Sequence, residues 1–113
     1  MDTYFDSGSP RNVTLTGITS TTLLLRWEPP EEDPGSGTIL QYSIMCSDGD
    51  SLPQHRLSVL NQSLQLMDLR PFTSYNCCVS AQKSNGNSLY SCSSQTTSED
   101  GKFVQKILLA NNY

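Results

Sequence analysis

The chain has 113 residues, a formal net charge of −4 and a hydrophobic content of 35%. This length fits one domain, and the acidic balance disfavours nucleic acid and anionic membrane surfaces, both of which are bound through basic patches. No run of about 18 apolar residues is present, so no segment is predicted to span a membrane.

Short alternating segments follow a polar stretch at residues 1–9, which we interpret as a flexible leader. In each segment an apolar side chain recurs at every second residue, the period of a strand that buries one face. Leu23, Leu25 and Trp27 share one such face. The predicted strands lie near residues 13–15, 22–27, 39–46, 56–60, 64–66, 75–81 and, within a wider window, 89–97.

Turn and loop residues separate these segments. Pro29 and Pro30 end the second strand, because proline cannot donate a ladder hydrogen bond. The acidic and glycine-rich stretch 31–37 is a loop by composition. Residues 85–87, Asn-Gly-Asn, form the clearest hairpin turn. About seven short strands with almost no helical pattern before residue 102 predict an all-β, seven-stranded antiparallel β-sandwich over residues 10–100.

Residues 101–113 follow the predicted domain as a separate tail. Phe103, Val104, Ile107 and Leu108 have the spacing of a short helix. Three interpretations compete: the start of a linker or next domain, a segment that packs on the sandwich, or a self-association element. We expect the first, and we expect any signal peptide or membrane anchor of the parent chain to lie outside these residues.

Three segments in order resemble a known family. They are Leu23-x-Leu25-x-Trp27-Glu28-Pro29-Pro30, Gly37-Thr38-Ile39-x-x-Tyr42-x-Ile44 and Leu69-x-Pro71-x-Thr73-x-Tyr75-x-x-x-Val79-x-Ala81. Together they resemble the fibronectin type III domain, an immunoglobulin-like fold.

The resemblance places Trp27 in the core, and it implies that the Tyr75 hydroxyl reaches a backbone group a few residues upstream. An immunoglobulin domain is excluded, because it needs a cysteine well before the tryptophan and the first cysteine here is Cys46.

Four cysteines, Cys46, Cys77, Cys78 and Cys92, allow three disulfide pairings. Strand alternation turns Cys46 and Cys77 inward and Cys78 outward. The order of strands in the family's sheet then implies the pairs Cys46–Cys77 and Cys78–Cys92. Zinc is disfavoured, since adjacent cysteines on a strand point to opposite faces. The remaining alternative is four reduced cysteines in an intracellular protein.

Two tripeptides, Asn12-Val13-Thr14 and Asn61-Gln62-Ser63, match the acceptor pattern for N-glycosylation. Such tripeptides are common by chance. Together with an even number of cysteines and the adhesion-type fold that the resemblance implies, they predict an extracellular or cell-surface location.

Catalytic chemistry finds no support in the residues. The single histidine, His55, lies in a polar stretch without a predicted reactive thiolate. The acidic run 31–33 lacks the ligand spacing of a calcium loop. We therefore expect no catalytic residue, metal, cofactor or small-molecule substrate.

Surface recognition remains as the expected function. The sequence indicates a non-catalytic module that binds or spaces proteins within a larger cell-surface receptor or adhesion protein, and a monomer when isolated. The loops at 31–37 and 83–88 are expected at one end of the sandwich. The alternatives are an intracellular structural module with reduced cysteines, and an accessory domain beside an enzyme.

Overall fold

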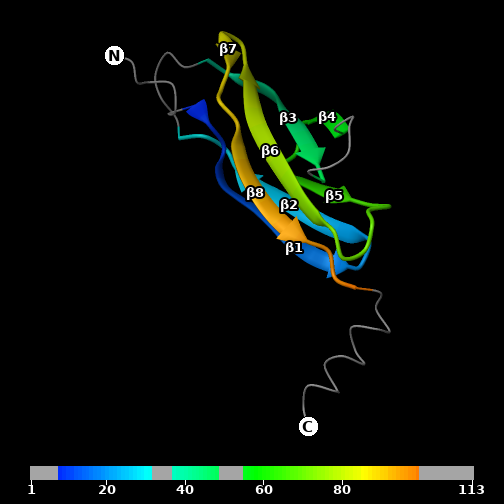
Figure 1. Cartoon of the computed structure of the whole chain (residues 1–113). Helices are drawn as coiled ribbons and strands as arrows, with labels where there is room; N and C mark the ends of the chain where they lie inside the picture. Colours follow the sequence, from blue (N-terminus) through cyan, green and yellow to red (C-terminus); the bar gives the residue numbers. More distant parts are fainter. Residues whose placement is uncertain (1–7, 32–36, 49–54, 100–113) are drawn as a thin grey trace.

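The computed structural model describes residues 8–31, 37–48 and 55–99, which form two antiparallel sheets packed face to face (Figure 1). Residues 1–7 of the predicted leader at 1–9, loop residues 32–36, residues 49–54, residue 100 and the predicted tail at 101–113 lie outside the described residues. Within the described part the strands are β1 (Arg11–Thr19), β2 (Thr22–Glu28), β3 (Ile39–Ser47), β4 (His55–Val59), β5 (Ser63–Leu66), β6 (Ser74–Lys83), β7 (Gly86–Asn87) and β8 (Ser91–Thr96).

One sheet has the strand order β1-β2-β5, and the other has the order β4-β3-β6 with β7 and β8 both paired along the far edge of β6. The predicted antiparallel sandwich is confirmed. The eighth strand arises because the final strand is divided: β7 pairs with Gln82 and Lys83, whereas β8 pairs with residues 74–79. Between them the chain keeps one backbone bond, in which Ser88 N donates to Ala81 O over 2.9 Å.

The core lies between the inward faces of the two sheets. Leu23, Leu25 and Trp27 come from β2, as the alternation predicts. The Trp27 ring meets the Tyr42 ring edge-on, with centroids 5.4 Å apart. This edge-to-face arrangement is favourable because the partly positive edge of one ring meets the partly negative face of the other. The other buried apolar residues are Leu15, Ile44, Cys46, Leu66, Tyr75, Cys77, Val79 and Ala81.

The hydroxyl group of Tyr75 accepts a hydrogen bond from the backbone N–H of Arg70 over 2.9 Å. This is the upstream backbone contact that the resemblance implied, and it pins the segment between β5 and β6 to the core strand. Thr97, which directly follows β8, also holds this segment through hydrogen bonds. Its hydroxyl donates to Arg70 O over 2.6 Å and accepts from Thr73 N over 2.9 Å.

Two disulfide bonds hold β6 to both of its neighbours. Cys46 on β3 and Cys77 on β6 are register partners with an S–S distance of 2.14 Å, and Cys78 on β6 pairs with Cys92 on β8 at 1.99 Å. The pairs are those that the family's strand order implies. The bonded cysteines are 31 and 14 residues apart in the sequence. Chain-entropy arguments therefore predict that each bond raises the free energy of unfolding by about 3–4 kcal/mol.

The loop ends at one pole of the sandwich are tied together. Thr38 N donates to Ser84 Oγ, and Ser84 N donates to Thr38 O over 2.8 Å. Gly37 has a φ of 93°, and a Cβ there would collide with the side chain of Asn85. Glycine is therefore required at this approach. The described ends of the two predicted loops do lie at the same pole.

We predict that Tyr75→Phe lowers the free energy of unfolding by about 1 kcal/mol, because the partly buried hydrogen bond from the Arg70 N–H to the Tyr75 hydroxyl is lost. Urea unfolding followed by Trp27 fluorescence measures the change. Tyr90→Phe is the matched control, since Tyr90 is exposed and its hydroxyl is 3.4 Å from Ser43 Oγ. The control is expected to stay within about 0.5 kcal/mol of the parent protein. Equal losses in both variants would contradict a structural role for the Tyr75 bond.

Candidate functional site

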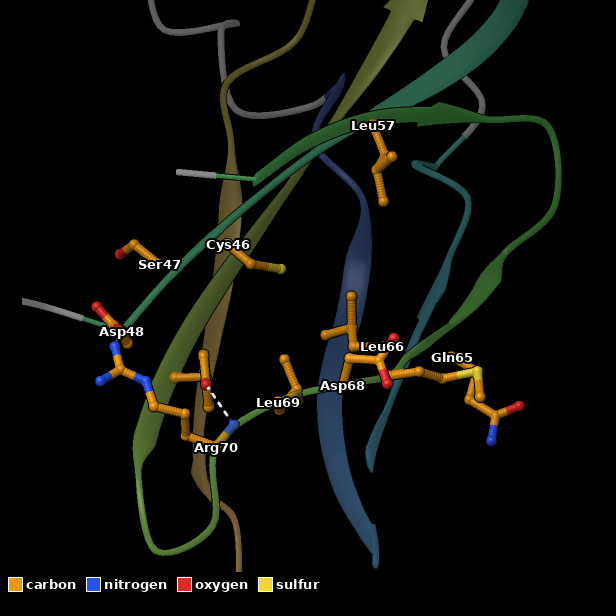
Figure 2. A pocket seen from close by; sticks show the side chains of 11 residues that line it. Cys46, Ser47, Asp48, Leu57, Gln65, Leu66, Asp68, Leu69 and Arg70 are labelled. Atoms are coloured by element: carbon orange, nitrogen blue, oxygen red, sulfur yellow. Dashed lines mark hydrogen bonds and ion pairs between the residues drawn. The ribbon is translucent and has the colours of Figure 1, made fainter. Parts of the chain in front are cut away.

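A groove of about 450 Å³ opens along the side of the sandwich between β4 and β5, which are edge strands of different sheets (Figure 2). Its walls come from the end of β3, from Leu57 on β4, from the end of β5 and from the segment that leads into β6. The lining residues are Cys46, Ser47, Asp48, Leu57, Gln65, Leu66, Met67, Asp68, Leu69, Arg70 and Tyr75.

The middle of the groove is apolar. Leu66, 8% exposed, belongs to the core, whereas Leu57 and Met67 are 46% and 63% exposed. Leu57 and Leu66 point toward one another across the groove in Figure 2. Directly after Met67, Asp68 takes a φ of 60°, which is uncommon for a residue other than glycine. The groove thus presents two apolar side chains that the fold does not bury.

The polar end of the groove is an ion pair. Arg70 Nη2 lies 2.6 Å from Asp48 Oδ2. Figure 2 shows the two side chains meeting at this end of the groove. The Asp48 side chain is 8% exposed and that of Arg70 is 67% exposed. The backbone of Arg70 is held in turn by the Tyr75 hydroxyl. The Asp48 carboxylate and the Arg70 guanidinium are therefore held at one end of the groove, beside its apolar residues Leu57, Leu66 and Met67.

This arrangement suits binding rather than bond-making chemistry. The sulfur of Cys46, which lines the groove, is committed to a disulfide. Within the described ranges no group of three or more His, Cys, Asp or Glu side chains could hold a metal ion. No helix in that part of the chain has the length and apolar character that a membrane crossing requires. The groove presents an apolar surface beside one ion pair.

The residues singled out from the sequence are spread over the domain. Asn12, with a φ of 51°, and Asn61 are both exposed. His55 begins β4 and is the register partner of Cys46, but its side chain is outside those described. Of the acidic run, the described residue Glu31 forms an exposed ion pair with Arg11, with Glu31 Oε2 3.9 Å from Arg11 Nη1. None of these four residues lines the groove, whereas Cys46 and Tyr75, which the sequence analysis also singled out, do line it.

The sequence analysis did not identify the exposed apolar residues of the groove, Leu57 and Met67. One local signal was available. Leu66 and Met67 are adjacent apolar residues at the end of an alternating segment, so one of the two must face away from the core. No comparable signal marks Leu57, because its exposure depends on the distance between two sheet edges.

Comparison with known proteins matches residues 8–97 to the fibronectin type III domain. Receptor-type tyrosine-protein phosphatase F of Rattus norvegicus is 37% identical over 82 residues, which cover 71% of this chain and 4% of that protein. A sidekick homolog of Caenorhabditis elegans is 34% identical over 88 residues, covering 72% and 4%.

Among solved structures, the fn3 domain of human collagen α-1(XX) superposes with a TM-score of 0.66 at 27% identity, covering 80% of this chain and 84% of that chain. The chain therefore spans a small part of the curated relatives it matches and nearly the whole of a single solved domain.

We predict that Leu57→Ser and Met67→Ser each change the free energy of unfolding by less than about 1 kcal/mol, because both side chains are largely exposed. Leu66→Ala is the buried comparison and is expected to cost about 2–5 kcal/mol. Urea denaturation of the three variants measures the difference. A loss at Leu57 as large as that at Leu66 would show that the groove wall is part of the core.

Proposed function

The chain belongs to the fibronectin type III family, and we propose that it is a non-catalytic, protein-binding module in the extracellular part of a receptor or adhesion protein. The observation that carries the proposal is the double disulfide anchoring of β6. Disulfides are typical of secreted and cell-surface domains and rare in cytosolic ones. The receptor-type phosphatase and sidekick relatives support the same setting.

A second candidate is the accessory role beside an enzyme. The similarity to a receptor-type tyrosine-protein phosphatase favours it. The domain would still contribute binding or spacing and no catalysis, because function in such proteins resides in sites and not in the fold itself. The intracellular alternative with reduced cysteines is disfavoured, since all four cysteines are paired.

The groove between β4 and β5 is the surface that we assign to a protein partner. Both strands are sheet edges, so an extended segment of another protein can lie along them and place an apolar side chain over Leu66. Leu57 and Met67 would cover that side chain from either side, and Arg70 would select a segment with an acidic or polar neighbour. The domain itself would remain a monomer.

The extent of the module and its modification are also proposals. We place the module at residues 10–100 and interpret 101–113 as the start of a linker. Asn12 and Asn61 are exposed, as an acceptor for N-linked glycan must be, and we propose both as glycosylation sites.

We predict that the native chain is labelled on intact cells by a membrane-impermeant amine reagent, and that its cysteines give no reaction with maleimide after denaturation without reductant.

An amidase that removes N-linked glycans should lower the mass of the protein, and Asn12→Gln together with Asn61→Gln should remove that shift. Labelling only after permeabilisation, together with four reactive thiols, would instead establish the intracellular alternative.

We also predict that a photo-crosslinking amino acid at Met67 captures a protein on the surface of cells that express the parent chain. The same amino acid at Leu89, 53% exposed and outside the groove, is the matched control. The adduct at position 67 should disappear when Leu57→Ser is added. Adducts that form equally at both positions, or at neither, would rule out the groove as the contact region.

A further inference from the structure

The two disulfides of β6 differ in how far solvent can reach them. Cys46 and Cys77 are 4% and 0% exposed and belong to the core cluster. Cys92 is exposed and Cys78 is partly buried on the outward face of the same sheet. Thiol–disulfide exchange begins when a thiolate reaches a disulfide sulfur, so accessibility separates the two bonds.

The described surroundings of the outward bond present no electrostatic barrier to an approaching anion. Nothing in the described side chains beside it carries a charge, so no carboxylate there repels a thiolate. By strand register and alternation, the described neighbours on this face are Met45, Asn76, Ser80 and Ser94. Tyr90 directly precedes β8, and its hydroxyl lies 3.4 Å from Ser43 Oγ.

One sulfur of the outward bond has a polar partner. Asn76 Nδ2 donates to Cys78 Sγ over 3.5 Å. The amide is oriented for this by a second bond, in which Ser94 Oγ donates to Asn76 Oδ1 over 2.9 Å. A donor aimed at Cys78 stabilises negative charge on that sulfur. The exposed sulfur of Cys92 is therefore the one to be attacked, and the sulfur of Cys78 is the better leaving group.

We propose that Cys78–Cys92 is a thiol–disulfide exchange site for dithiol reductants, including extracellular dithiol oxidoreductases, with Asn76 as its positioning residue. The thiolate of the reductant attacks Cys92 Sγ and forms a mixed disulfide, while the Cys78–Cys92 bond breaks and its electron pair leaves on Cys78. The second thiol of the reductant then forms the reductant's own disulfide and releases Cys92. Two electrons and two protons pass to the protein, and the reductant is oxidised.

Reduction at this site removes the covalent link between β8 and β6 without opening the core. β8 keeps its backbone pairing with β6 and its contacts to β1, including Gln95 Nε2 donating to Leu15 O over 3.3 Å. The inner bond continues to join β3 to β6. The last strand thus changes from a covalently held edge to one held by non-covalent contacts alone.

The test is reduction of the intact protein under native conditions with dithiothreitol, followed by maleimide quenching and peptide mass mapping. We expect Cys78 and Cys92 to be labelled at least about 10-fold faster than Cys46 and Cys77, with Trp27 fluorescence unchanged. With glutathione in place of the dithiol, the mixed disulfide should map to Cys92. Equal labelling rates for both bonds, or an adduct on Cys78, would overturn the proposal.

The role of Asn76 is tested by substitution. Asn76→Ala should slow reduction several-fold and Asn76→Asp should slow it more, because the carboxylate repels both the incoming thiolate and the leaving one. Ser74→Ala is the matched control on the same strand and face, two residues further from the bond. Stability of each variant is measured in parallel. A rate change that Ser74→Ala reproduces, or that follows the loss of stability alone, would refute the positioning role.

Discussion

The adjacent cysteines of β6 impose the constraint on which the rest of the structure depends. Neighbouring side chains of a strand point to opposite faces, so Cys77 bonds inward to β3 and Cys78 bonds outward to β8. One strand is thereby locked to both of its neighbours within two residues. Because cross-strand bonds join register partners, a slip of either pairing would separate the sulfur atoms.

The hydrogen bonds around Tyr75 extend this constraint to the segment before β6. Tyr75 lies two residues before Cys77 on the same inward face, and its hydroxyl holds the backbone of Arg70. Arg70 is then in place to meet Asp48, which follows β3, the strand that Cys46 bonds to β6. The polar end of the groove is thus built from segments that the inner disulfide and the tyrosine keep together.

The two faces of the second sheet have separate roles. The inward face contributes Tyr42, Ile44 and Val79 to a core closed to solvent. The outward face carries uncharged side chains around an accessible disulfide, as far as the described side chains show. The groove lies at neither face, but at the open side where edge strands of the two sheets meet. A binding surface and a redox-sensitive bond can therefore occupy one small domain without sharing residues.

The amino-acid sequence by itself determined which residues face the core. Trp27, Tyr75 and Cys77 could be assigned inward because the two-residue period of a strand is a local property, readable within a few positions. The division of the last strand into β7 and β8 could not be read from the sequence, since it depends on where the chain between them departs from its pairing with β6.

Only the tertiary structure decided which strands are neighbours. The disulfide partners followed from a family's strand order and not from the spacing of the cysteines. The groove joins Leu57 on β4 to Met67, which directly follows β5, and β4 and β5 belong to different sheets. The link from Ser94 through Asn76 to Cys78 joins β8 to β6. Such contacts depend on register and on the distance between sheets, which hydrophobic alternation does not encode.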